Sequence, residues 1–149
     1  MFPVNKILCP LDFSEHSMEA LDNAIELAQN LSSKIILVNV ISPIPVVPTP
    51  SHPGEFNIAS YREMLKESSE NNLDSIVKNN LPEDLEYEKI IRTGDPAQEI
   101  DKVAKELDVD LLVISTHGRS GLGHLLFGSV AEKIIRHTSC PVLTIKSMK

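Results

Sequence analysis

The sequence predicts an α/β domain built on a parallel sheet with helices on both of its faces. Short apolar runs typical of strands alternate along the chain with stretches whose apolar residues recur at helical spacing. One run, Lys34–Ile41, is nearly continuous and β-branched, as expected for a parallel strand covered on both sides. Such an alternation of strands and helices favours right-handed crossovers. With 149 residues and no internal repeat, residues 1–149 are predicted to form a single domain.

The first two strands and the helix between them are clearly marked. Residues 5–10 contain a short apolar run, Ile7, Leu8 and Cys9, that ends in a proline, which predicts a buried strand. A loop over residues 11–14 follows. Glu15–Leu31 then carries apolar residues at helical spacing, with Ser14 as its expected N-cap. The next strand, Lys34–Ile41, is predicted to lie in the centre of the sheet.

The middle of the chain is more polar. Prolines recur throughout residues 42–55, which excludes a hydrogen-bonded strand there and predicts an extended surface loop. A polar, amphipathic helix is predicted over residues 61–77, ending before Leu81 and Pro82. Residues 85–91 alternate imperfectly between charged and apolar side chains, so the third strand is expected near an edge of the sheet.

The rest of the chain continues the alternation. Asp95 before Pro96 is a capping pattern, and it predicts a short third helix with apolar positions up to Leu107. Residues 111–114 read as a buried fourth strand and residues 115–127 as a glycine-bearing loop. A fourth helix is predicted over Ser129–His137, and a fifth strand over Val142–Ile145.

The net charge and the cysteine content indicate which classes of partner and which cellular compartment to expect. The net charge of -7 repels phosphate backbones and anionic lipid, which makes nucleic acid and membranes unlikely partners. Cys9 and Cys140 each stand beside a proline and an apolar run, which indicates buried thiols in a reducing compartment. No apolar stretch approaches the length of a membrane span, and the first residues do not resemble a signal peptide. We therefore expect a cytoplasmic protein.

The loops after the first, second and fourth strands are the expected ligand-binding loops. Ligands of open parallel sheets bind outside the carboxyl ends of the strands, where the strand order reverses. These loops begin near Asp12, Val40 and Ser115. The Gly-Lys-Ser or Gly-Lys-Thr of a P-loop is absent, and the glycine spacing also excludes the dinucleotide fingerprint.

The loop after the fourth strand, residues 115–127, contains three glycines and is followed directly by a fourth. Gly118, Gly121 and Gly123 let backbone N–H groups turn inward, and Gly128 with Ser129 sets a helix N-terminus beside them. This arrangement predicts a phosphate-binding cradle. The alternative from spacing alone is a tight turn, with Ser129 acting only as a helix cap.

Four stretches of the sequence resemble the universal stress protein family. They are Cys-Pro-Leu-Asp-Phe-Ser at residues 9–14, Ser-Thr-His-Gly-Arg-Ser-Gly-Leu at 115–122, Leu-Leu-Phe-Gly-Ser-Val-Ala-Glu at 125–132 and Cys-Pro-Val-Leu at 140–143. The ATP-binding members carry Gly-x2-Gly-x9-Gly-Ser/Thr, which is matched by Gly118, Gly128 and Ser129, while Ser115 takes the place of the first glycine. The resemblance implies a single Rossmann-like five-stranded sheet in the order 3-2-1-4-5, with the site between the first and fourth strands.

The resemblance also implies roles for individual residues. Asp12 would meet the ribose or adenine, Val40 would present backbone groups to adenine, and the glycine loop and following helix would surround ribose and phosphates. The expected nucleotide-binding residues are Pro10, Leu11, Asp12, Val40, Ser115, Thr116, His117, Gly118, Arg119, Gly121, Gly128, Ser129 and Val130. Alternative roles remain for three of them: a turn or cap for Asp12, loop packing for His117 and a solvated position for Arg119.

The expected function is binding of ATP, or of ADP or AMP, by a regulatory or stress-response protein. Mg²⁺ would accompany the phosphates. No catalytic nucleophile, paired carboxylates or metal site can be assembled from the loops, so the protein is not expected to be an enzyme, and any ATP hydrolysis should be very slow. The alternatives are a slow ATP hydrolase or phosphoryl or nucleotidyl transferase, and a scaffold dimer that no longer binds nucleotide. The family resemblance further implies a homodimer through the last strand, Val142–Ile145.

Overall fold

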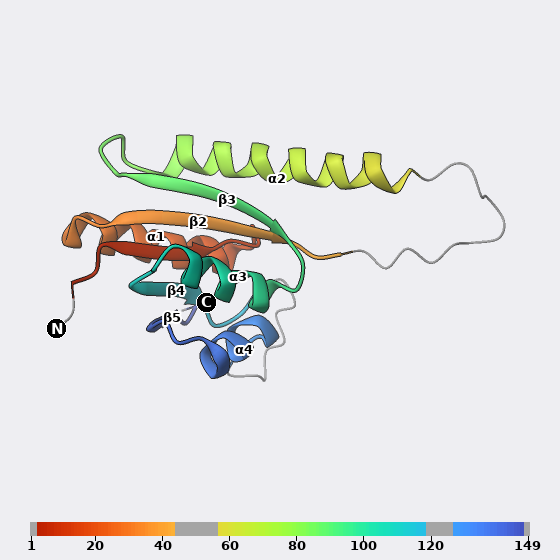
Figure 1. The fold of residues 1–149 in the computed structure, drawn as a ribbon. Coiled ribbons are helices and arrows are strands. Elements are labelled where there is room, and N and C mark those ends of the chain that lie inside the picture. Colours follow the sequence, from red (N-terminus) through yellow and green to blue (C-terminus); the bar gives the residue numbers. More distant parts are fainter. Residues whose placement is uncertain (1–2, 44–56, 119–126, 148–149) are drawn as a thin grey trace.

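A five-stranded parallel sheet forms the centre of the molecule (Figure 1). The computed structural model describes residues 3–43, 57–118 and 127–147. The strands run in the order β3-β2-β1-β4-β5, which confirms the predicted fold class and strand order. They are β1 (Lys6–Pro10), β2 (Lys34–Ile41), β3 (Tyr87–Thr93), β4 (Leu111–Ser115) and β5 (Val142–Ile145).

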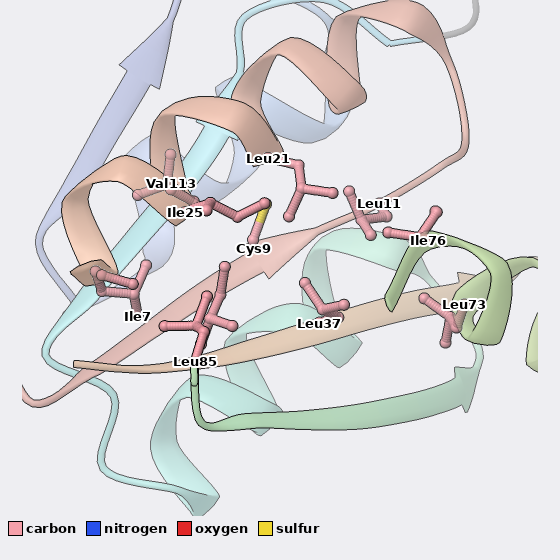
Figure 2. Close-up of a cluster of buried hydrophobic side chains, with 13 residues drawn as sticks. Ile7, Cys9, Leu11, Leu21, Ile25, Leu37, Leu73, Ile76, Leu85 and Val113 are labelled. Carbon is pink, nitrogen blue, oxygen red and sulfur yellow. The ribbon is translucent and has the colours of Figure 1, made fainter. Parts of the chain in front are cut away.

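Four helices cover the two faces of the sheet: α1 (Glu15–Leu31), α2 (Ile58–Asn80), α3 (Pro96–Glu106) and α4 (Ser129–His137). Because side chains alternate along a strand, β1 sends Ile7 and Cys9 to one face and Leu8 to the other. The first face packs against α1 and α2, and Figure 2 shows this cluster. The second face packs against α3 and α4. Within the described parts of the chain, no helix has the length and apolarity needed to cross a membrane.

The ends of two predicted elements were wrong. The third strand begins at Tyr87, because Leu85 lies in the preceding turn, where its N–H donates to the Pro82 carbonyl at 3.1 Å. Its side chain is buried all the same, which is why the apolar pattern resembled a strand. The second helix begins at Ile58, earlier than predicted, because the side chain of Asn57 caps it by accepting from the Ser60 N–H. The predicted caps at Ser14 and Asp95 are confirmed.

The two cysteines differ in their surroundings. Cys9 is fully buried in the cluster beneath α1, and burial raises the pKa of its thiol to about 12, so it stays protonated at neutral pH. Cys140 was expected in the core but is half-buried at the edge of the second cluster. Burial is also the main cause that raises the pKa of the Cys140 thiol. Neither thiol therefore has the lowered pKa typical of a reactive cysteine.

Candidate functional site: a cavity at the carboxyl ends of three strands

A cavity of about 530 Å³ opens at the carboxyl ends of β1, β2 and β4. Its volume falls within the range of roughly 300–1,000 Å³ that is usual for small-molecule sites. Every predicted site residue that the structure describes lines it: Pro10, Leu11, Asp12, Val40, Ser115, Thr116, His117, Gly118, Gly128, Ser129 and Val130. Arg119 and Gly121, also predicted, lie outside the described residues. The fold thus brings together segments that are more than 100 residues apart in the chain.

Asp12 links the loop after β1 to the start of α1. Its Oδ1 accepts hydrogen bonds from the Ser14 N–H, at 3.0 Å, and from the Ser14 hydroxyl. Ser14 Oγ in turn accepts from the Ser17 N–H at 3.2 Å and caps α1. The carboxylate therefore has a local turn-forming role through Oδ1, and it holds its place at the cavity wall through these bonds.

Ser115, in place of the first glycine of the family pattern, is compatible with the site. It is the last residue of β4, and the described non-glycine residues with positive φ are Phe13, Ser32 and Asp108, so its backbone suits an L-residue. Its hydroxyl donates to the His117 carbonyl at 2.7 Å. Serine at this position thus steadies the loop and introduces no backbone strain.

Gly118 and Gly128 let the loop after β4 approach its neighbours closely. A Cβ atom added to Gly118 would lie only 2.8 Å from Asp12 Oδ2, a separation that real Cβ atoms essentially never show. Gly128 donates its N–H to the Thr116 carbonyl at 2.5 Å, which draws the start of α4 against the end of β4. Glycine at position 118 therefore leaves room for the Asp12 carboxylate.

The N-terminus of α4 faces the cavity. We expected Ser129 as a possible cap, but the cap residue is Gly128, and Ser129 is the first residue of the helix. Gly128 has no side chain to cap with, and the first-turn N–H groups of any α-helix lack an intrahelical acceptor. Ser129, Val130 and Ala131 of this first turn all line the cavity. Together with the helix dipole, their N–H groups can hold an anion.

His117 has contacts that fit a packing role. Its Nδ1 lies 3.0 Å from Thr116 Oγ1, and its ring centroid lies 6.1 Å from that of His16 on α1. Thr116 itself is buried and donates its N–H to the Ile145 carbonyl at 2.9 Å. The loop after β4 is thus joined to α4, to β5 and to α1.

The wall formed by α2 was missed by the sequence analysis. Leu65, Ser68, Ser69 and Asn72 line the cavity from this helix. Serine and asparagine at helical spacing resemble an ordinary solvated face, so the sequence of the helix alone does not predict that it lines a cavity. The available signal was Asn39, a polar residue near the end of the apolar strand β2, whose side chain bonds to Ser69.

The chain was then compared with known proteins. The model of the universal stress protein family matches residues 3–146. Universal stress protein MJ0531 of Methanocaldococcus jannaschii is 34% identical over 144 residues, which cover 97% of this chain and 83% of that protein. The solved structure of MJ0577, from the same organism, has a TM-score of 0.79 at 30% identity and covers 99% of both chains.

A third comparison concerns a more distant solved structure. A universal stress protein solved in complex with cAMP has a TM-score of 0.67 at 20% identity, covering 97% of this chain and 98% of that one. At this identity the likeness is one of fold. Since the family model covers nearly the whole sequence and the relatives align along their length, the chain belongs to the universal stress protein family.

Proposed function

We propose that this protein binds adenine nucleotides, ATP above all, in the cavity at the ends of β1, β2 and β4. The observation that carries the proposal is that the Asp12 carboxylate and the N-terminus of α4 line one cavity, and that the cap residue of this helix, Gly128, has no side chain to bond to its N–H groups. A nucleotide needs both kinds of partner, because its ribose and base donate hydrogen bonds while its phosphates accept them. The fold-level likeness to a universal stress protein in complex with cAMP supports the same ligand class.

The proposed roles follow the chemistry of the wall. Asp12 accepts from ribose hydroxyls or adenine, and Val40 offers its backbone groups to adenine from the end of β2. Gly118, Gly128 and the first turn of α4 receive the ribose and phosphates. Mg²⁺ would be held mainly by the phosphate oxygens, as is usual for this ion. ADP and AMP present the same nucleoside and are accepted by the same wall.

Equilibrium titration tests the proposal. Calorimetric titration of purified protein with ATP, ADP and AMP should give saturable one-site binding, and GTP at the same concentrations should bind more weakly. Mass spectrometry of material released from the unfolded protein should identify the nucleotide that it carries. Absence of binding to all three adenine nucleotides would favour the scaffold dimer that no longer binds nucleotide. The main sequence feature in favour of that alternative is Ser115 in place of the first glycine, but the backbone of Ser115 is unstrained.

We further propose that binding changes the state or partner of a regulatory protein in the cytoplasm and that the protein is not an efficient enzyme. Among the described residues that line the cavity, Asp12 is the one carboxylate and no lysine is present. Ordinary phosphoryl transfer relies on a lysine and on acidic metal ligands. We expect phosphate release under excess ATP to be far slower than about 1 per second, the low end of ordinary enzymes. A rate at or above this value would favour the hydrolase or transferase instead.

A homodimer through β5 is also part of the proposal. β5 lies at an edge of the sheet, and its Leu143 side chain is 38% exposed. An apolar edge strand of this kind is suited to pairing with a second copy. Leu143→Lys should shift the protein towards monomer in sedimentation velocity, because it places a charge in the paired edge. Met64→Lys, at an exposed apolar position on α2, is the matched control and should leave the distribution unchanged. A dimer that persists in Leu143→Lys would exclude this interface.

A further inference from the structure

Asn39 is a buried polar residue on a face of β2 that is otherwise apolar. Ile35 and Leu37 lie on the same face, since side chains alternate along a strand, and both are fully buried in the cluster beneath α1 and α2. Figure 2 labels Leu37 in this cluster. Asn39 continues this row and is only 8% exposed. A buried amide is unfavourable unless its donors and acceptors are satisfied. Its partners therefore indicate what it does.

Both ends of the Asn39 amide are hydrogen-bonded. Nδ2 donates to the Leu11 carbonyl at 2.7 Å, and Oδ1 accepts from the hydroxyl of Ser69 at 2.7 Å. The carbonyl can only accept, so the amide nitrogen must face Leu11 and the amide oxygen is left for Ser69. Ser69 is itself 4% exposed and comes from α2. The amide therefore connects the loop after β1 with α2.

The bond to Leu11 controls the peptide that leads into Asp12. The Leu11 carbonyl and the Asp12 N–H belong to one planar peptide group, so fixing the carbonyl fixes where the Asp12 backbone begins. The Leu11 N–H is held as well, because it donates to the Val38 carbonyl at 2.8 Å. β2 therefore holds Leu11 at both of its backbone groups.

The residue after Asp12 shows why such a restraint is needed. Phe13 has a φ of 65°, in the left-handed region that residues with a side chain rarely adopt. A loop with this strain keeps its shape only when its surroundings impose it. Asn39 holds the loop before Asp12, and the bonds between Asp12 Oδ1 and Ser14 hold it after.

We propose that Asn39 is a positioning residue for nucleotide binding, which orients Asp12 through the Leu11–Asp12 peptide while Ser69 of α2 orients the Asn39 amide. The inference rests on the adenine nucleotide binding proposed above. It makes the docking of α2 a determinant of affinity through the buried Ser69 hydroxyl, in addition to the side chains with which this helix lines the cavity. Affinity for the nucleoside end of the ligand should therefore depend on two side chains that are almost inaccessible to solvent.

Titration of Asn39→Leu with ATP provides the first test. Leucine has a similar size but cannot donate to the Leu11 carbonyl, so the dissociation constant for ATP should rise about tenfold or more. The constant for AMP should rise by a similar factor, because the loss concerns the nucleoside end. Ser69→Ala tests the same connection without altering β2 and should cause a smaller rise. Unchanged ATP affinity in Ser69→Ala would remove α2 from the proposal.

A matched control separates positioning from stability. Ile35→Val and Ile35→Ala remove buried carbon atoms from the cluster beneath α1 and α2, at the other end of β2 from Asn39. Ile35 does not line the cavity. Ile35→Val should lower the free energy of unfolding by less, and Ile35→Ala by more, than the Asn39 and Ser69 variants do. All titrations are made at a temperature where circular dichroism shows each variant folded. If the Ile35 variants weaken ATP binding as much as Asn39→Leu does, Asn39 is structural only.

A double-mutant cycle identifies the route through Asp12. Asp12→Asn keeps the Oδ1 acceptor that Ser14 uses but replaces the other oxygen with an NH₂ donor. If Asn39 acts through Asp12, adding Asn39→Leu to Asp12→Asn should change the ATP affinity little further. Losses that multiply in the double variant would overturn this route. Wild-type protein that binds no adenine nucleotide would instead overturn the proposed function, and wild-type affinity in Asn39→Leu would overturn this inference alone.

Discussion

Replacing Gly128 with valine is expected to abolish ATP binding and to leave the domain folded. Gly128 precedes the first turn of α4 and lines the cavity, so a branched side chain there competes with the phosphates for the space beside the helix N–H groups. Its backbone has φ −68° and ψ 161°, an extended conformation that valine adopts readily. A Cβ at this position meets the Thr116 carbonyl oxygen at 3.4 Å, which is an ordinary contact. We expect a loss of stability of only about 1 kcal/mol, since valine is a poor N-cap.

Ser129→Ala is the matched variant for this prediction. It removes one hydroxyl from the first residue of α4 and leaves every backbone donor in place. Because Gly128 and not Ser129 is the cap, no capping bond is lost, and ATP affinity should fall much less than in Gly128→Val. Calorimetric titration of wild type and both variants measures the order, with circular dichroism as the folding control. A folded Gly128→Val protein with wild-type affinity would exclude the cradle at α4.

Gly118→Ala is expected to weaken ATP binding at least tenfold and to lower the stability of the domain. The new methyl group would lie 2.8 Å from Asp12 Oδ2, and Asp12 is held by Ser14, so either the carboxylate or the loop after β4 must move. Overpacking of this kind typically lowers the free energy of unfolding by about 1–3 kcal/mol. Urea denaturation and calorimetric titration measure the two effects separately.

The contact with Asp12 can be isolated by a second substitution. Within 4 Å of a Cβ at Gly118, the described atoms outside its chain neighbours belong to Asp12 alone. In an Asp12→Ala background the added methyl group therefore no longer meets a carboxylate among the described residues, and Gly118→Ala should cost much less stability there than in wild type. Additive losses of stability would show that the strain arises elsewhere. Gly128→Ala is the control: its Cβ lies at ordinary contact distances from the described atoms, so it should change the free energy of unfolding little in wild type and in Asp12→Ala alike.

Most of the fold could be predicted because its strands and helices bury continuous faces. α1, for example, presents apolar residues at helical spacing, and β2 is a nearly continuous apolar run because both of its faces are covered. Ser14 and Asp95 mark helix starts by their capping chemistry. Leu85 shows the limit of such patterns. Its side chain is buried although its backbone is in a turn, and burial alone does not distinguish a turn from a strand.

The candidate site could be predicted where it follows from topology and not where it depends on packing between distant elements. Parallel strands must end at one edge, so the loops at Asp12, Val40 and Gly118 had to converge there. The bond from Ser69 to Asn39 depends on how α2 lies across the sheet, which no local pattern encodes. The lack of room for a Cβ atom at Gly118 beside Asp12 is of the same kind, since the two residues are more than 100 positions apart in the chain.

The origin of the cavity in both ends of the chain also affects folding and synthesis. Asp12 comes early and Gly128 late, so the candidate site is completed only when α4 has formed and docked. Contacts this distant in sequence slow the folding of a domain relative to local ones. A nascent chain still lacking α4 should therefore have an incomplete cavity, without the helix N-terminus proposed to hold the phosphates. Once the domain is folded, a bound ligand should stabilise all of it. A ligand present at 100 times its dissociation constant raises the free energy of unfolding by roughly 2.7 kcal/mol.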